Sequence, residues 1–226
     1  YYRHQAGDFN SLSSQVITSI AEDSQGNIWV GTYFNGLSKI NPITAQFINY
    51  RHKISNPDSL SHDFILSLFE DSYGNIWIGT SGGGLNLFDK ESNTFKHYNK
   101  KNGLPSDIVH SIEEDNYGYL WLSTSLGLSR FNPKKETFKN YNVRDGLQSN
   151  DFNQGASFKS KKGEMFFGGT NGFNRFFPEN IIDNIQPPNV VLTDMLLLNK
   201  SVPMIIQKLI PFYQLVFYPL TKLVLV

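Results

Sequence analysis

Hydrophobic and polar residues alternate in short runs along most of the chain, and no stretch shows the three-to-four-residue spacing of an amphipathic helix. Residues 108–114 form one alternating run, and residues 75–79 form another around a tryptophan. Clusters of Gly, Asp, Asn and Pro separate the runs, as turns separate the strands of an antiparallel sheet. The pattern therefore predicts an all-β chain of short strands.

The strands recur in a repeat. In each copy an alternating strand leads into a turn, Asp-x-x-Gly in three of the copies, where Asp can accept a hydrogen bond from the backbone two residues on and Gly supplies a positive φ. A strand centred on an aromatic residue follows, then a Gly-led strand and, in three copies, a strand that ends in Phe-x-x-Tyr. The central aromatic residues, 48, 44 and 45 residues apart, are Trp29, Trp77, Trp121 and Phe166.

Four short strands in about 45 residues predict one blade of a β-propeller. We expect a partial propeller of about four four-stranded blades, at residues 12–50, 60–98, 104–141 and 147–178. A blade cannot bury both of its faces alone, and a large ring at one fixed blade position suits the contact between neighbours. We therefore predict that the four central aromatic residues pack between blades.

The composition argues against several classes of function. The 226 residues include 20 basic and 20 acidic side chains, so no net charge attracts the chain to nucleic acid. There is no cysteine, and no pair of histidines has the spacing of a metal site. His97 shares its repeat position with Asn49 and Asn140, which predicts an exposed strand position. We expect no catalytic residue, no metal and no cofactor in this chain.

Several motifs together resemble the two-component regulator propeller repeat. They are Asp-x-x-Gly-Asn-Ile-Trp-x-Gly-Thr, Gly-Leu-x-x-Phe, Phe-x-x-Tyr and the Gly-Leu-Pro-Ser-Asp of residues 103–107. Residues 146–153 and 167–179 are similar to the last blade before that family's three-tyrosine Ig-like β-sandwich, and residues 187–203 resemble its first strands. We expect blades at residues 1–185 and a truncated Ig-like start at 186–226, with an atypical end at Met204–Val226.

The resemblance implies a periplasmic sensor of a membrane-bound hybrid histidine kinase, commonly one that responds to oligosaccharides. Its implied partners are an oligosaccharide, the rest of the propeller, a transmembrane helix and a kinase in the parent protein, with a homodimer as a further option. The chain opens on Tyr1 without a targeting pattern, and we expect it to be an internal piece of a longer protein.

Antiparallel connectivity places the turn between the second and third strands on the same side of the blades as the linkers that join them. On that side residues 32–37 insert two aromatic side chains where residues 80–85 have small ones. Polar groups on the linkers suit a polar ligand, although they equally suit capping of the linker backbone. The candidate ligand-binding residues are Tyr33, Phe34, Asn35, His62, Asp63, Ser106, Asp107, Asn150, Phe152 and Asn153.

Two other functions remain open at this point. One is a protein-interaction propeller scaffold without a small-molecule ligand, which a flat apolar face would favour over a polar and aromatic pocket. The other is a lyase or glycosidase built on a propeller, which needs clustered carboxylates or a metal site that these repeats lack.

Overall fold

The computed structural model describes residues 1–181, 196–197 and 200–201, and the chain divides into two compact units, Tyr1–Ile182 and Asp183–Val226. In the second unit β16 (Leu196–Leu197) pairs with β17 (Lys200–Ser201) in antiparallel fashion. The rest of the predicted Ig-like segment 186–226, Met204–Val226 included, lies outside the described residues, so the Ig-like domain stays a prediction. No helix in the described part of the chain is long and apolar enough to cross a membrane.

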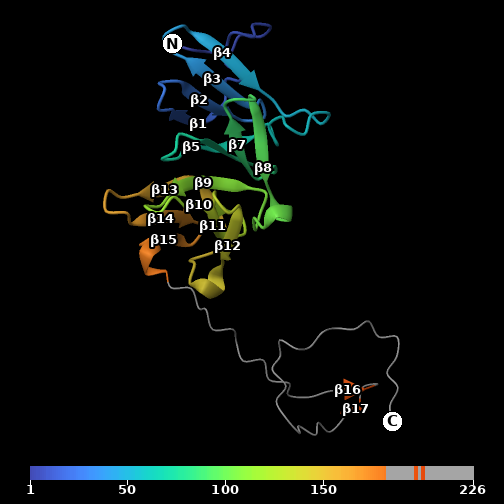
Figure 1. Cartoon of the computed structure of the whole chain (residues 1–226), viewed down its shortest axis with the longest axis vertical. Coiled ribbons are helices and arrows are strands. Elements are labelled where there is room, and N and C mark those ends of the chain that lie inside the picture. Colours follow the sequence, from blue (N-terminus) through green and yellow to red (C-terminus); the bar gives the residue numbers. More distant parts are fainter. Residues whose placement is uncertain (182–195, 198–199, 202–226) are drawn as a thin grey trace. The chain divides into compact units, whose positions relative to one another are not determined.

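The first unit consists of four antiparallel sheets, called blades 1 to 4 here, whose strands pair in chain order (Figure 1). This arrangement confirms the predicted all-β, propeller-like fold. Blade 1 contains β1 (Ile17–Glu22), β2 (Ile28–Thr32), β3 (Leu37–Asn41) and β4 (Gln46–Tyr50). Blade 2 contains β5 (Ile65–Glu70), β6 (Ile76–Thr80), β7 (Leu85–Asp89) and β8 (Thr94–Tyr98). Blade 3 contains β9 (Val109–Glu114), β10 (Leu120–Thr124), β11 (Gly127–Asn132) and β12 (Thr137–Tyr141).

Blade 4 differs from the expected four strands, because its sheet has three in the described residues. They are β13 (Phe152–Lys159), β14 (Met165–Gly169) and β15 (Gly172–Phe176). A short 3₁₀ helix, η3 (Pro178–Asn180), follows β15, with Pro178 at its start. Proline is favoured at the first position of a helix, which suits Pro178 at the start of η3. Proline alone does not exclude a fourth strand, because Pro42 and Pro133 hold the same repeat position in blades 1 and 3, which have one.

Two other 3₁₀ helices lie in linkers between blades, η1 (Lys100–Asn102) before blade 3 and η2 (Val143–Asp145) before blade 4. Each begins at an asparagine that caps the helix and ends at a glycine in the left-handed region, Gly103 and Gly146. The linkers are therefore ordered turns with their own hydrogen bonds.

The first strands of neighbouring blades lie side by side, with β5 between β1 and β9 and with β13 next to β9 (Figure 1). The contacts also reach past the nearest neighbour, because β13 approaches β5 and the Gln154 side-chain amide donates to the Leu66 carbonyl at 3.2 Å. The first strands therefore form the inner edge of a tightly curved stack of blades.

Each tryptophan packs against the blade that follows it. Trp29 lies against Ile76, Ile78 and Phe88 of blade 2, and its indole centre is 5.0 Å from that of Phe88. Trp77 and Trp121 make the same kind of contact with blades 3 and 4. All three indoles are at most 1% exposed. Burying a ring of this size contributes up to about 4–6 kcal/mol, so these contacts are a large part of what joins the blades.

The aspartate of each Asp-x-x-Gly turn carries the hydrogen bonds that orient these indoles. Asp71 accepts from the backbone N–H groups of Tyr73 and Asn75, and its second oxygen accepts from Trp77 Nε1 at 2.8 Å. Asp23 and Asp115 bond the indoles six residues on in the same way, both at 2.9 Å. The bond to the residue two positions on was predicted, whereas the bond to the indole was not. One carboxylate therefore joins each turn to the contact between blades.

Blade 4 has neither the turn aspartate nor the tryptophan that donates to it in the other blades. Ser160 stands at the position of the aspartate and accepts from the Glu164 N–H at 3.0 Å, and Phe166, at the position of the tryptophan, has no N–H to donate. Phe166 lies half-buried beside Phe158 and Phe173 of its own blade. No further blade covers it within the described residues, so the predicted packing between blades is absent at this position.

Replacing Asp71 with alanine should lower the free energy of unfolding by roughly 2–3 kcal/mol, because the buried Trp77 N–H loses its acceptor. The double variant Asp71→Ser/Trp77→Phe, which reproduces the pair in blade 4, should be more stable than the sum of the two single variants predicts. Urea unfolding of the parent chain, Asp71→Ser, Trp77→Phe and the double variant measures this coupling. Strict additivity would show that the hydrogen bond does not contribute.

Acid should weaken blade 1 through Asp23. Burial alone raises the pKa of Asp23, but the hydrogen bonds from Trp29, Asn27 and Gln25 outweigh it and lower the pKa below its ordinary value of 3.8. The ionised carboxylate therefore stabilises the fold fully above that value, and the stabilisation is lost as the pH falls through the lowered pKa. The variant Asp23→Asn should be less stable at neutral pH and lose less stability on acidification. Unfolding curves between about pH 2 and pH 7 test this, and equal pH slopes for both proteins would contradict it.

Candidate functional site

One side of the blades is formed by the turns between second and third strands together with the linkers between blades, and we call it the linker face. The two kinds of segment are hydrogen-bonded to each other. The N–H of Gly36 donates to the Asp63 carbonyl at 2.8 Å, and the N–H of Gly127 donates to the Asn150 carbonyl at 2.6 Å. Each turn is thus attached to the linker that leads into the next blade.

Three aromatic rings meet on the linker face at the junction of blades 1 and 2. Tyr33 and Phe34 come from the turn after β2, and Phe64 comes from the linker before β5. The ring centre of Tyr33 is 4.3 Å from that of Phe34 and 4.2 Å from that of Phe64, in edge-to-face geometry. Tyr33 is 44% exposed and Phe34 is 56% exposed, so this aromatic cluster presents apolar surface to solvent.

The backbone of Phe34 is strained. Its φ of 66° lies in the left-handed region, which costs a residue other than glycine on the order of 1 kcal/mol. The Phe34 carbonyl accepts from Arg51 at 3.4 Å, and Arg51 also forms an ion pair with Asp63 at 2.9 Å. The linker thus holds the turn in a conformation that keeps the Phe34 ring on the surface.

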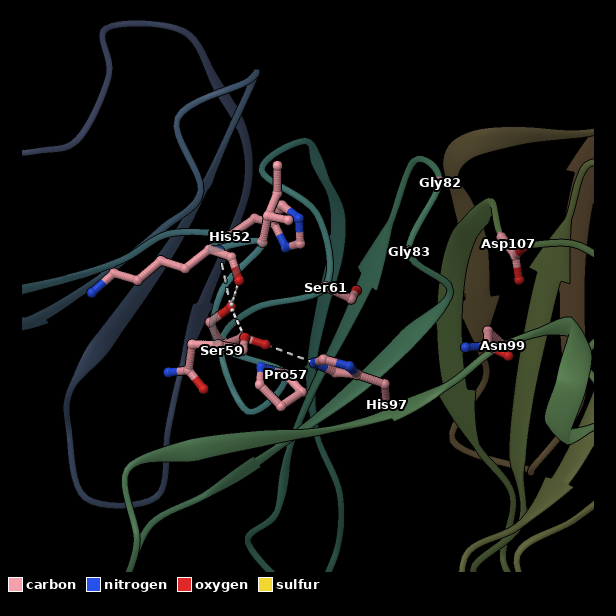
Figure 2. Close-up of a pocket in the computed structure, with 12 residues that line it drawn as sticks. His52, Pro57, Ser59, Ser61, Gly82, Gly83, His97, Asn99 and Asp107 are labelled. Carbon is pink, nitrogen blue, oxygen red and sulfur yellow. Dashed lines mark hydrogen bonds between the residues drawn. The ribbon is translucent and has the colours of Figure 1, made fainter.

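A cavity of about 300 Å³ opens on the same face in blade 2 (Figure 2). Its walls come from the linker at His52–Ser61, from the turn at Gly82 and Gly83, from His97 on β8, and from Asn99 and Asp107 before blade 3. His97 Nε2 lies 2.7 Å from the Ser59 carbonyl, a bond drawn as a dashed line in Figure 2. The linker from Arg51 to Phe64 therefore borders both the aromatic cluster and the cavity.

Several residues that line the cavity carry polar groups that make no hydrogen bond within the described residues. They include the ammonium group of Lys53, Nε2 of His52, the side-chain amide N–H groups of Asn99 and one carboxylate oxygen of Asp107. Together they offer donors and acceptors to a ligand that carries hydroxyl groups. An adjacent exposed ring cluster and an unpaired polar lining suit a ligand that has both polar edges and apolar faces.

Some of the predicted ligand-binding residues are engaged by the linker backbone. Asp63 Oδ1 accepts from the His52 N–H at 2.7 Å, Asp107 Oδ1 accepts from the Lys100 N–H at 2.8 Å, and Asn150 Oδ1 accepts from the Val143 N–H at 3.0 Å. These three equivalent side chains therefore hold the linkers in place. Asp107 lines the cavity as well.

The other residues predicted to bind a ligand differ in how far their side chains are exposed. Phe152 is 2% exposed and lies in the core with Trp121, so its ring is not available on the surface. Ser106 is 4% exposed and bonds the Ser125 hydroxyl at 2.7 Å. His62 accepts from the Phe64 N–H and lies beside Gly82, next to the cavity. Asn35 is half-buried and Asn153 is exposed.

Sequence reasoning missed Phe64, His52 and His97. The expected exposure of His97 differs from the structure, in which it is half-buried against the linker. The signal was present in the repeat, because Asn49 and Asn140 occupy the same position and also donate to linker carbonyls, at 3.0 and 2.9 Å. A donor side chain at this position ties the fourth strand to the linker of its own blade.

Two titratable residues on β9 have perturbed pKa values. Burial lowers the pKa of His110, against an opposing effect of Asp151, and both of its ring nitrogens lack a hydrogen-bond partner within the described residues. Burial raises the pKa of Glu113, which accepts from the Ser157 hydroxyl at 2.8 Å. Among the described residues no three His, Asp or Glu side chains gather as a metal site would require.

The matches to known proteins fall on the repeats. The family model described as two component regulator propeller matches residues 11–34, 59–82 and 103–125. These three segments are similar to the two component regulator propeller repeat. The extracellular domain assigned to a hybrid two component system of B. thetaiotaomicron is 27% identical with a TM-score of 0.72, over 89% of this chain and 28% of that one. A second such domain from B. thetaiotaomicron, 24% identical over 78% of this chain and 25% of that one with a TM-score of 0.66, shows the same fold.

A curated histidine kinase of Formosa agariphila is 34% identical over 102 residues, which cover 45% of this chain and 7% of the kinase. The chain therefore spans about a quarter of the solved extracellular domains and a small part of the kinase. The similarity to extracellular parts of two-component systems agrees with the prediction that the propeller repeats of this chain are not catalytic.

In blade 2, the turn between β6 and β7 beside the cavity requires glycine at its end. Gly84 has a φ of +77°, and a Cβ there would lie 2.2 Å from the Tyr98 carbonyl oxygen. At the same turn position in blade 4, Gly172 has a φ of +106° with open space around it. Gly172→Ala should cost about 1 kcal/mol of stability from backbone strain alone, and Gly84→Ala should cost more than twice as much because its backbone must also move. Urea unfolding compares the two, and equal losses would show that the close approach at Gly84 is relieved cheaply.

Proposed function

We propose that this chain is a ligand-sensing part of the periplasmic region of a hybrid histidine kinase, and that its linker face binds an oligosaccharide. The observation that carries this proposal is the exposed aromatic cluster of Tyr33, Phe34 and Phe64 beside a cavity with unpaired polar groups. Sugar rings have apolar faces that stack on aromatic rings and hydroxyl edges that need hydrogen-bond partners. The two parts of the linker face match these two parts of a sugar.

The strain at Phe34 supports a role for the cluster in binding. An exposed aromatic ring adds nothing to the core, and its residue costs backbone energy in the left-handed region. Such strain persists where surrounding contacts enforce it, and here Arg51 and Asp63 do so. A polar, hollow site also suits a small ligand better than the flat apolar patch expected of a protein-interaction scaffold.

The relatives support the proposed cellular role. The similarity to an extracellular domain of a hybrid two component system and to a histidine kinase favours a parent protein with further blades, a transmembrane helix and a cytoplasmic kinase. Ligand held at the linker face would then alter the position of a following domain relative to the blades. The resemblance of residues 187–203 to an Ig-like start supports that domain as the relay.

Binding of this chain to an immobilised library of plant and host oligosaccharides tests the proposal, with the best glycan then titrated by calorimetry. The variant Tyr33→Ala/Phe34→Asn should weaken binding roughly 10- to 100-fold, because it removes two stacking rings. Asparagine tolerates the left-handed region, so the turn keeps its conformation.

The matched control is Tyr117→Ala, which removes an equally accessible ring, 66% exposed, from a turn between first and second strands on the other side of the blades. It should bind the glycan as the parent chain does. No binding to any glycan, or equal losses in both variants, would refute the oligosaccharide site at the linker face.

A further inference from the structure

A second cavity lies on the linker face where the chain enters blade 1, and we call it the blade 1 cavity. It has a volume of about 330 Å³, and its walls include the segment 4–13 and Asn49 on β4. The cavity described above, called the blade 2 cavity here, has walls that include the segment 52–61 and His97 on β8. Each of these positions lies 48 residues after its counterpart. The two cavities therefore occupy equivalent places in consecutive repeats.

The loops that form the two cavities share their hydrogen bonds. A serine near the end of each loop accepts from the backbone N–H six residues before it, at 3.0 Å for Ser11 and 2.9 Å for Ser59. The same hydroxyl donates to the carbonyl three residues before it, at 2.8 and 2.7 Å. Asn49 and His97 bond the carbonyls of these two serines at 3.0 and 2.7 Å. The loops are thus one structural unit that occurs twice.

The length of this loop exceeds what a connection between blades needs. Residues 51–64 lie between β4 and β5, whereas residues 99–108 and 142–151 suffice between β8 and β9 and between β12 and β13. The shorter linkers fold into η1 and η2, with their own caps. The extra residues of the longer loop therefore contribute a cavity wall and are not required to join the blades.

Both loops present an apolar ring and a polar group at matching positions. Phe9 is 91% exposed in the first loop, and Pro57 is exposed at the same position of the second. One oxygen of Asp8 and of Asn56 accepts from the backbone N–H two residues on, at 2.9 and 3.0 Å. The other polar atom of each side chain makes no hydrogen bond within the part of the chain that the structure describes. Each cavity can therefore contact an apolar face and a hydroxyl edge of a sugar.

One linker connects the two cavities with the aromatic cluster. Arg51 lines the blade 1 cavity, and its guanidinium group donates to the Phe34 carbonyl at 3.4 Å. His62, beside the blade 2 cavity, accepts from the Phe64 N–H at 3.0 Å. The aromatic cluster is thus in contact with residues that border each cavity.

Building on the proposed function, we propose that the linker face binds one extended glycan that enters both cavities and crosses the aromatic cluster. Both cavities are near the lower limit of the roughly 300–1,000 Å³ of ligand pockets, so each suits a short part of such a glycan. Once one cavity is occupied, the rest of the same glycan reaches the other at a high effective concentration. The preferred ligand is therefore a linear glycan of several sugars, and short fragments bind weakly.

The test uses the glycan that binds best in the oligosaccharide library, cut into size fractions of roughly two to twelve sugars. Calorimetry should show two molecules of the shortest fraction bound per chain, but one molecule of the longest. The affinity should rise roughly 10- to 100-fold from the shortest fraction to the longest, because the long glycan occupies both cavities. An affinity that does not change with length, or two long molecules bound per chain, would overturn the inference.

Matched variants alter one cavity at a time. Gln5→Ala/Phe9→Ala removes exposed side chains from the blade 1 cavity, and Lys53→Ala/Pro57→Ala removes the equivalent ones from the blade 2 cavity. Each should weaken binding of the longest fraction roughly tenfold and reduce binding of the shortest from two molecules per chain to one. Unchanged affinity for the longest fraction in either double variant would contradict occupancy of both cavities by one glycan.

The control is Ile43→Ala, which removes a side chain that is 94% exposed from the turn between β3 and β4, on the other side of the blades. It should bind every fraction as the parent chain does, and urea unfolding checks that all three variants fold as the parent does. If no fraction binds, the proposed function fails and this inference fails with it. If the fractions bind and Tyr33→Ala/Phe34→Asn weakens binding while the two cavity variants do not, this inference alone fails.

Discussion

A buried carboxylate in each of the first three blades decides where the largest contact between blades can form. The same side chain accepts hydrogen bonds from the turn backbone and from an indole six residues on, so the turn and the ring cannot be placed independently. The indole then packs against the next blade. Ser160 and Phe166 show the converse, because the blade without the carboxylate also has no indole that would need one. Local turn chemistry and the stacking of blades are in this way parts of one interaction.

Much of the fold could be predicted because its signals are local. Alternating residues, turns rich in glycine and aspartate, and the spacing of the tryptophans predict strands whose bounds the structure confirms within a few residues. That blade 4 has three strands, and not four, in the described part of the chain was not predicted. Pro178 is not a signal for it, because Pro42 and Pro133 stand at the same repeat position in blades that have a fourth strand. The Asp–Trp hydrogen bond also escaped sequence reasoning, because spacing alone does not tell that two side chains on either side of a turn point toward each other.

The sequence assigned the candidate site to one side of the blades and named Tyr33, Phe34 and Asp107, but it did not indicate Phe64 or most of the residues that line the cavity. Connectivity alone brings the turns and the linkers together, and both the aromatic cluster and the cavity lie among them. Which side chains face the cavity depends on the path of the linker, which Asp63 and Asp107 set through their own backbone hydrogen bonds. A linker aspartate can be recognised in the sequence, whereas the neighbours that it orients cannot. Phe152 illustrates the same difficulty, since β13 turns its ring into the core.

The bond from Gln154 to Leu66 joins blade 4 to blade 2 across the inner edge of the stack. In a strictly linear array, disturbance of one module reaches a distant one only by passing through those between them. Here β13 also contacts β5 directly, without blade 3 between them. Because β5 begins directly after Phe64, only a few residues and one hydrogen bond separate the aromatic cluster from blade 4. The inner edge thus connects blades 2 and 4 by a shorter path than the order of the chain suggests.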